Sequence, residues 1–188
     1  MNGDIDVGDD LGHAVDLILD TNVLSEVTRQ QPDGTVLRWL DGLDEDRTFI
    51  SVLSIAEISR GVALLDDGKR KGALKDWLTQ DLPQRFEHRV LPANEQVARA
   101  WGDLMGLAKR CGRGMSSMDG LIAATAVAHN VVLATRNTKD FDGFGTELVD
   151  PWTTGQEGHD DLLRMRRSVH LQTSSRLSQT PNSTPKHM

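Results

Sequence analysis

Short apolar runs alternate with helical apolar patterns across residues 15–152, and this alternation constrains the fold of the chain more than any other feature. Strand-like runs lie at residues 15–19, 48–52, 89–91, 131–134 and 147–149. Between them, apolar side chains recur at the spacing of one helix face, at residues 36–43, 55–65, 74–82, 97–108 and 118–129. Short strands that alternate with helices predict an α/β domain with a mostly parallel, helix-flanked sheet.

The two ends of the chain differ in composition from this alternating part. Residues 1–14 are rich in Gly and Asp, which predicts a flexible acidic leader. Residues 153–188 are polar and end in a stretch of mostly Ser, Thr, Gln, Pro and Asn, which predicts a mostly disordered tail. A short helix around Leu162, Met165 and Val169 is the one ordered element expected there. The folded domain is therefore expected to span residues 15–152.

Several classes of protein are excluded by what the sequence lacks. No apolar run approaches the roughly 18 residues that a membrane-spanning helix needs. The acidic N-terminus has neither the basic nor the apolar part of a secretory signal. The single cysteine, Cys111, excludes an internal disulfide and suits a reducing compartment. We therefore expect a cytoplasmic protein that does not contact a membrane.

The net charge of −7 comes from different parts of the chain in unequal amounts. Residues 1–16 carry −5, residues 17–152 carry −4 and residues 153–188 carry +2. If four acids of the middle part bound two divalent cations, that part would become neutral. The charge thus neither excludes nor favours a nucleic-acid substrate.

Four acidic residues follow predicted strands or open predicted helices. Asp20 ends the first strand, Glu57 lies just after the second, Asp119 opens the helix at 118–129, and Asp140 follows the strand at 131–134. Each also has a purely structural interpretation. Asp20 is a good helix cap, Glu57 an ordinary solvated helix residue, Asp119 part of a capping box and Asp140 a turn former.

As a set, the four acids predict a cation site. Carboxyl ends of parallel strands meet at one edge of a sheet, so these side chains are expected to gather there. Like charges about 4 Å apart repel by roughly 1 to 4 kcal/mol per pair, so such a cluster requires a cation. All-oxygen ligands point to Mg²⁺ or Mn²⁺, and the six histidines show no zinc-type spacing.

Four segments in this order resemble PIN-domain proteins, above all the VapC and FitB-like toxins of bacterial toxin–antitoxin pairs. The resemblance spans about residues 17–152 and leaves both ends of the chain unexplained. The segments are Leu-Asp-Thr-Asn-Val-Leu-Ser at 19–25, Ser-Ile-Ala-Glu-Ile-Ser-Arg-Gly at 54–61, Asp-Gly-Leu-Ile-Ala-Ala-Thr-Ala at 119–126 and Ala-Thr-Arg-Asn-Thr-Lys-Asp-Phe at 134–141.

The resemblance implies a three-layer α/β/α fold and assigns roles to the acids. Asp20, Glu57 and Asp119 would occupy the three principal catalytic and metal-binding positions of the family. The more variable fourth position would be taken by Asp140, with Asn137 as the competing residue.

Other positions of the motifs also gain a meaning from the resemblance. Asn22 and Thr135 match polar positions that line the family's site, where they would orient ligands or waters. Gly120 departs from the pattern because a larger helix former is common there, and it is expected to loosen its helix slightly.

The function implied is that of a Mg²⁺- or Mn²⁺-dependent endoribonuclease that hydrolyses RNA phosphodiester bonds as the toxin of a toxin–antitoxin pair. A small DNA-binding antitoxin and an RNA substrate would be its partners. A homodimer is also implied, with spare apolar surface expected around Trp39, Trp77 and Leu78.

Two alternative functions remain at this point. One is a catalytically silent PIN-like domain that binds RNA or a protein; the other is a metal phosphatase, although Asp20 lacks the Asp-x-Asp motif of a nucleophile.

Basic residues lie close to two of the acids in the sequence. Lys109, Arg110 and Arg113 precede Asp119, and Arg136 lies between the strand at 131–134 and Asp140. These cations could hold the RNA backbone near the metal. The alternative is a solvated helix end, where cations are favoured by the helix dipole.

Overall fold

A five-stranded parallel sheet forms the centre of the computed structural model, which describes residues 15–154. The strand order is β3-β2-β1-β4-β5, and every neighbouring pair is parallel. The strands are β1 (Leu17–Leu19), β2 (Thr48–Ser51), β3 (Val90–Leu91), β4 (Val132–Ala134) and β5 (Leu148–Val149). The predicted mostly parallel sheet is confirmed, and each strand lies within the run that predicted it.

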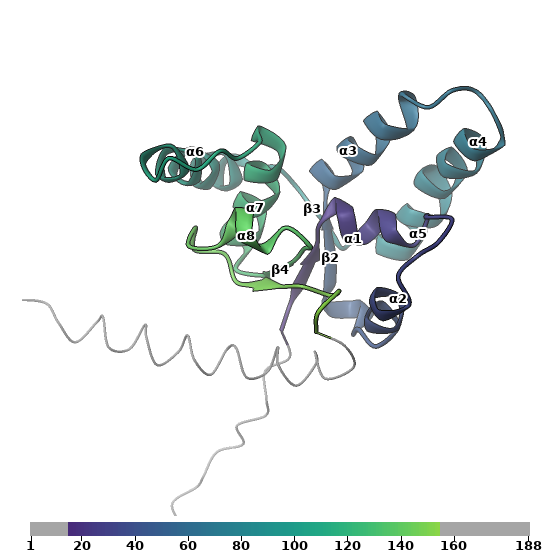
Figure 1. Ribbon diagram of the computed structural model, residues 1–188, viewed down its shortest axis with the longest axis horizontal. Helices are drawn as coiled ribbons and strands as arrows, with labels where there is room; N and C mark the ends of the chain where they lie inside the picture. Colours follow the sequence, from purple (N-terminus) through teal and green to yellow (C-terminus); the bar gives the residue numbers. More distant parts are fainter. Residues whose placement is uncertain (1–14, 155–188) are drawn as a thin grey trace, which may run out of the picture.

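Helices cover both faces of this sheet, as the three-layer prediction requires. Figure 1 shows α6 and α7 on one side of the strands and the helices from α1 to α5 on the other. The helices are α1 (Thr21–Glu26), α2 (Gly34–Asp41), the short η1 (Glu45–Arg47), α3 (Val52–Ala63), α4 (Lys69–Asp76), η2 (Trp77–Asp81), α5 (Leu82–Phe86), α6 (Glu95–Arg110), α7 (Ser117–His129) and α8 (Thr138–Phe141).

Alternation along the central strands divides the interior into two cores. Leu17 and Leu19 of β1 pack into one core with α1, α2 and α5, whereas Ile18 packs into the other with α6 and α7. Successive side chains of a strand point to opposite faces, so a strand covered on both sides reads as a continuous apolar run. This explains why the sequence signal for β1 is an unbroken apolar segment.

The segment at residues 74–82, predicted as one helix, is helical without a break but is not α-helical throughout. α4 ends at Asp76, and η2 is a π-helical turn in which the Leu82 N–H bonds the Trp77 carbonyl. Pro83 follows immediately and has no N–H to continue an i→i−4 ladder. A single helix was therefore too simple a prediction for this segment.

Most tryptophans of the described chain pack in or against the core that contains α1, α2 and α5. Trp39 is buried in it, and Trp77 and Trp152 pack against it half-buried. Trp39 therefore offers none of the spare surface that was expected for a homodimer.

Within the described residues, no helix combines the length and apolar character that crossing a membrane would require. The predicted leader and the predicted tail from residue 155 onward, including the expected helix around Leu162, lie outside the described residues.

Candidate metal centre at the carboxyl edge of the sheet

Asp20 occupies the carboxyl end of the central strand, where β1 turns into α1. Its backbone N–H bonds the Ala134 carbonyl of the neighbouring strand at 3.0 Å, which extends the sheet by one residue. Its side chain caps α1 with an extended backbone, as the structural interpretation expected. In open parallel sheets this edge is where ligands bind. The capping role and a role in the site are thus compatible.

The Asp20 carboxylate is almost enclosed by hydrogen-bond donors. It is only 4% exposed. Its Oδ1 accepts from the Thr21 N–H at 2.7 Å, and its Oδ2 accepts from Asn22 Nδ2 and from the Thr135 hydroxyl, both at 2.6 Å. Asn22 and Thr135, expected to line the site, therefore both contact this acid directly.

The pKa of Asp20 is raised from 3.8 to about 6. Burial is the main cause, because it disfavours the charged form. The bonds from Thr135 and Thr21 act in the opposite direction, and the negative charges of Asp119 and Glu57 raise the pKa further. These three acids, more than thirty residues apart along the chain, thus lie close enough for their charges to interact.

Glu57 reaches the same edge from α3. That helix begins directly after β2, and Ser51 caps it by accepting the Leu53 N–H at 3.1 Å. Glu57 is half-buried, and its Oε2 accepts the Thr21 hydroxyl at 2.6 Å. The interpretation as an ordinary solvated helix residue is therefore wrong for this position.

Asp119 stands in the first turn of α7, in the capping box that the sequence predicted. Its N–H donates to the Ser116 hydroxyl oxygen at 3.1 Å, and that hydroxyl donates to Asp119 Oδ2 at 2.7 Å. One carboxylate oxygen remains without a protein partner in the described part of the chain.

Gly120 has a packing role that the sequence did not reveal. A Cβ at this position would lie 2.6 Å from Met105 Sδ and 3.2 Å from Trp101 Nε1, both on α6. A side chain at this position would force Met105 or Trp101 to move, so the glycine suits the packing of α7 against these side chains. Gly120 therefore has a packing role in addition to the slight loosening of the helix that the sequence predicts.

The fourth acid is placed differently from the other three. Asp140 lies on α8, a single helical turn, and its side chain is exposed. It is not among the charges that shift the pKa of Asp20. The competing residue Asn137 has an exposed side chain, but its backbone N–H donates to the Thr135 hydroxyl oxygen at 3.0 Å. The structure thus links Asn137 to the site through its backbone.

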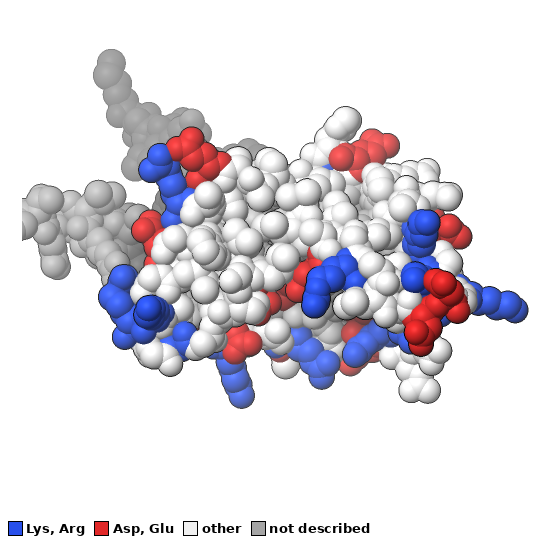
Figure 2. Space-filling model, turned by 90° about the horizontal axis from the view of Figure 1, so that it is seen from above, with Lys and Arg blue, Asp and Glu red and all other residues white. Residues whose placement is uncertain are grey.

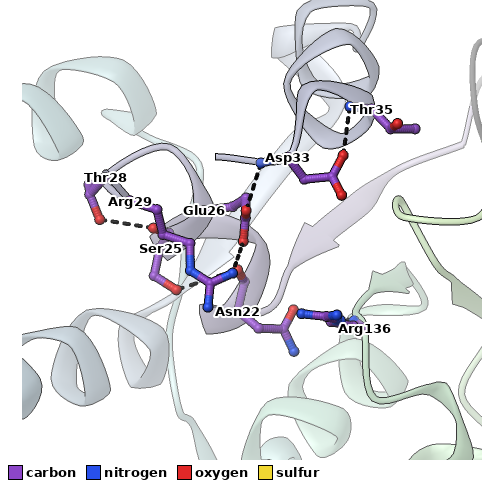
Figure 3. A network of polar contacts seen from close by, with 8 residues as sticks. All are labelled: Asn22, Ser25, Glu26, Thr28, Arg29, Asp33, Thr35 and Arg136. Carbon is purple, nitrogen blue, oxygen red and sulfur yellow. Dashed lines mark hydrogen bonds and ion pairs between the residues drawn. The ribbon is translucent and has the colours of Figure 1, made fainter. Parts of the chain in front are cut away.

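A second polar network lies at the loop between α1 and α2. Figure 3 shows Glu26 between the Arg29 guanidinium, at 2.9 Å, and the Asp33 N–H, at 2.8 Å. The same view shows the Asn22 amide facing Arg136. The backbone N–H of Arg136 donates to Asn22 Oδ1 at 3.3 Å. Glu26 is only 2% exposed and closes the loop between α1 and α2. It carries a structural role that no sequence motif indicated.

The predicted RNA-binding cations differ in whether their side chains are bound by other protein groups or exposed to solvent. Arg113 donates to the Lys139 and Asp142 carbonyls and stacks 4.7 Å from the Phe144 ring centre, so its guanidinium holds α8 in place. Arg136 is exposed and lies 5.2 Å from the Trp152 ring centre. Lys109 and Arg110 are exposed at the end of α6. In the view from above, acidic residues lie near the middle of the face with a basic residue beside them (Figure 2).

The donor set fits a hard divalent cation such as Mg²⁺ or Mn²⁺. It offers carboxylate, hydroxyl and amide oxygens. The two charges that act on Asp20, those of Asp119 and Glu57, are both negative. No three His, Cys, Asp or Glu side chains of residues 15–154 converge into a ready-made metal cage. Mg²⁺ does not require one, because it keeps several waters and uses one or two protein carboxylates.

Sequence reasoning overlooked Thr21 as a site residue. The signal was present, since a hydroxyl residue directly follows the acid at the end of a central strand. Which carboxylate that hydroxyl would meet depends on the packing of α1 against α3, and no local pattern encodes it.

Comparison with known proteins shows the family to which this fold belongs. The PIN domain family model matches residues 17–145. The toxin FitB of Neisseria gonorrhoeae is 40% identical over 136 residues, which cover 72% of this chain and 98% of that protein. The VapC ribonuclease Y4jK of Sinorhizobium fredii is 38% identical over 136 residues, covering 72% and 97%. The crystal structure of FitAcB from Neisseria gonorrhoeae superposes with a TM-score of 0.69 at 39% identity, covering 73% of this chain and 99% of that one. The chain therefore belongs to the PIN-domain family.

Proposed function

We propose that this protein is a Mg²⁺- or Mn²⁺-dependent endoribonuclease that acts as the toxin of a toxin–antitoxin pair. Its relatives include proteins named VapC ribonuclease and toxin FitB, and they align over nearly their whole length. A nuclease, which is a hydrolase, is the activity that these relatives support. The metal dependence is supported by the chemistry of the site.

The observation that carries the proposal is that the charges of Glu57 and Asp119 act on the buried Asp20 carboxylate at the carboxyl edge of the sheet. The three acids lie in or next to separate elements, and the charges of Glu57 and Asp119 raise the pKa of Asp20. A protein that only binds a partner gains nothing from this repulsion. A bound cation would relieve this repulsion and would favour the ionised form of Asp20.

The acids and their donors divide the work of the site. Asp20, Glu57 and Asp119 would hold the cation, with Asp140 or Asn137 adding to the outer part of the site. When bound, the cation would supply a nucleophilic water and stabilise charge on the phosphate. Thr135 and Asn22 both donate to Asp20 Oδ2 and the Thr21 N–H donates to Oδ1, so this carboxylate is held in one orientation. The Asp119 carboxylate would position the attacking water.

The exposed cations at the end of α6 and after β4 suit the RNA backbone. Lys109, Arg110 and Arg136 have side chains open to solvent, whereas Arg113 is committed to the α8 backbone. We therefore assign backbone binding to the first three and a structural role to Arg113. Phosphate contacts of this kind act on every sequence alike and weaken as salt rises.

A protein partner is part of the proposed function. Solved structures similar to this chain include FitAB bound to a DNA fragment and VapBC-1 from nontypeable Haemophilus influenzae, the latter with a TM-score of 0.58 at 25% identity. By analogy we propose a small DNA-binding antitoxin for this chain, and a homodimer of the toxin.

A cleavage assay tests the activity. The purified protein should fragment total RNA with Mn²⁺ or Mg²⁺, lose this activity in EDTA and regain it when the metal is restored. Asp119→Asn should be inactive while keeping the fold and melting temperature of the wild type. Cleavage that persists in EDTA would contradict metal dependence, and a wild type that cuts no RNA under any of these conditions would favour the silent alternative.

A further inference from the structure

Each of the three central acids is paired with one hydroxyl donor. Thr135 donates to Asp20 at 2.6 Å, Thr21 to Glu57 at 2.6 Å, and Ser116 to Asp119 at 2.7 Å. A hydroxyl orients a carboxylate without cancelling its charge, whereas Lys or Arg would neutralise it and compete with a cation. The pairing therefore fixes the acids and preserves their attraction for a cation.

Thr21 differs from the other two donors because it serves two acids at once. Its N–H donates to Asp20 Oδ1 at 2.7 Å, while its hydroxyl donates to Glu57 Oε2 at 2.6 Å. One residue thus fixes the end of β1 and a side chain of α3 relative to each other.

Glu57 depends on this contact more than Asp20 does. Asp20 has three donors, but the Thr21 hydroxyl is the only hydrogen-bond or ion-pair partner that the Glu57 side chain has among residues 15–154. A half-buried Glu without that bond would regain rotamer freedom and lose part of its orientation.

The ordinary role of a helical Thr is to bond a nearby backbone carbonyl. Thr125 of α7 and Thr28, just beyond the end of α1, do so, with hydroxyls that donate to the Leu121 and Ser25 carbonyls at 2.9 Å. Thr21 is the first residue of α1 and has no preceding turn of that helix to bond; its hydroxyl reaches across 36 residues to a side chain. Local helix stabilisation does not explain this choice of partner.

We propose that Thr21 is a positioning residue that holds Glu57 in the orientation in which it binds the cation together with Asp20. The proposal rests on the function proposed above. It predicts that the hydroxyl matters for metal affinity, while the side-chain methyl and the helix do not.

The test compares Thr21→Val, Thr21→Ser and Thr28→Val by Mn²⁺ titration calorimetry of the metal-free protein. Val keeps the shape and the backbone N–H of Thr21 and removes only the bond to Glu57. Thr28→Val is the matched control, because Thr28 is also half-buried and lies just beyond the other end of α1. Thr21→Val should weaken Mn²⁺ binding about tenfold, as loss of an outer-shell partner does. Thr21→Ser and Thr28→Val should bind like the wild type.

A double-mutant cycle provides a readout without metal. Thr21→Val, Glu57→Ala and the double variant are unfolded in urea, and the two substitutions should be non-additive because they remove the same contact. Wild-type affinity in Thr21→Val, equal losses in Thr21→Ser and Thr21→Val, or an additive cycle would each overturn the role of Thr21 alone. A wild type that binds no Mn²⁺ would overturn the proposed function, and the role of Thr21 with it.

Discussion

The acids at the end of β1, in α3 and in α7 are fixed in a different way from the acid on α8. Asp20, Glu57 and Asp119 each have a carboxylate oxygen held by a hydroxyl, and their backbones belong to elements that the two cores anchor. On α8 the backbone is held instead: Arg113 binds its carbonyls, and the Asp140 side chain remains exposed.

This difference separates two kinds of functional group. Side chains that bind a metal work best when other groups fix their oxygens before the metal arrives. A carboxylate on an exposed turn can instead move with the substrate or the bound waters. The comparison therefore ranks the acids within the proposed function: the three held carboxylates are the proposed metal ligands, and Asp140 is proposed to assist them.

The largest expected effect distinguishes the two groups directly. Asp20→Asn should lower the RNA cleavage rate by roughly 100-fold or more, since metal stabilisation of the reaction is worth several kcal/mol. Asp140→Asn should lower it by about tenfold or less. Single-turnover cleavage at saturating Mn²⁺ measures both, and equal losses in the two variants would remove the distinction between held and exposed acids.

The second expectation concerns stability and pH. The folded pKa of Asp20, about 6, lies above the unfolded value, so the folded state holds this proton more tightly. The stability that this group contributes is present below about pH 4 and is lost as the pH rises toward 6. At neutral pH, metal-free Asp20→Asn should therefore gain stability relative to the wild type, by at most about 3 kcal/mol.

Urea unfolding between pH 4 and 7.5 in EDTA measures this difference. It should grow with pH in favour of Asp20→Asn and shrink when Mn²⁺ is added to the wild type. A difference that is constant over this range would show that the folded protein does not perturb Asp20.

The third expectation concerns the packing of α7 against α6 at Gly120. Gly120→Ala should destabilise the protein by about 1 to 3 kcal/mol, because the added Cβ meets Met105 and Trp101 of α6. Gly102→Ala on α6 is the control, since nothing lies within 4 Å of a Cβ there, and it should stabilise by about 0.5 to 1 kcal/mol. Thermal unfolding compares the two variants. Equal stability would mean that α6 and α7 tolerate a wider separation.

The smallest expected effect concerns Arg113 and sharpens the description of α8. Arg113→Lys keeps the charge but loses the planar fork that binds two carbonyls, so it should destabilise by about 1 kcal/mol. Hydrogen exchange should increase within residues 138–144. Arg110→Lys, at an exposed position, should change neither. If Arg113→Lys instead leaves stability intact and weakens RNA binding, Arg113 belongs with the phosphate-binding cations.

The sequence predicted the strands and the acids that follow them because both depend on local patterns. An apolar run that ends in Asp20, or a Ser three residues before Asp119, is visible without knowledge of the fold. Tertiary approach is not visible in this way. The close packing at Gly120, the partner of the Thr21 hydroxyl and the carbonyls bound by Arg113 all join segments that lie far apart along the chain. The π-helical turn before Pro83 shows the related limit that periodicity alone does not distinguish one helix type from another.

Mn²⁺ titration calorimetry of four variants tests the central claim most directly. Asp20→Asn, Glu57→Gln, Asp119→Asn and Asp140→Asn are compared with the wild type under conditions where all five proteins are folded. We expect each of the first three substitutions to weaken Mn²⁺ binding by more than about tenfold, and Asp140→Asn by no more than a few-fold. Wild-type affinity in any of the first three, or the greatest loss in Asp140→Asn, would contradict a metal centre built from Asp20, Glu57 and Asp119.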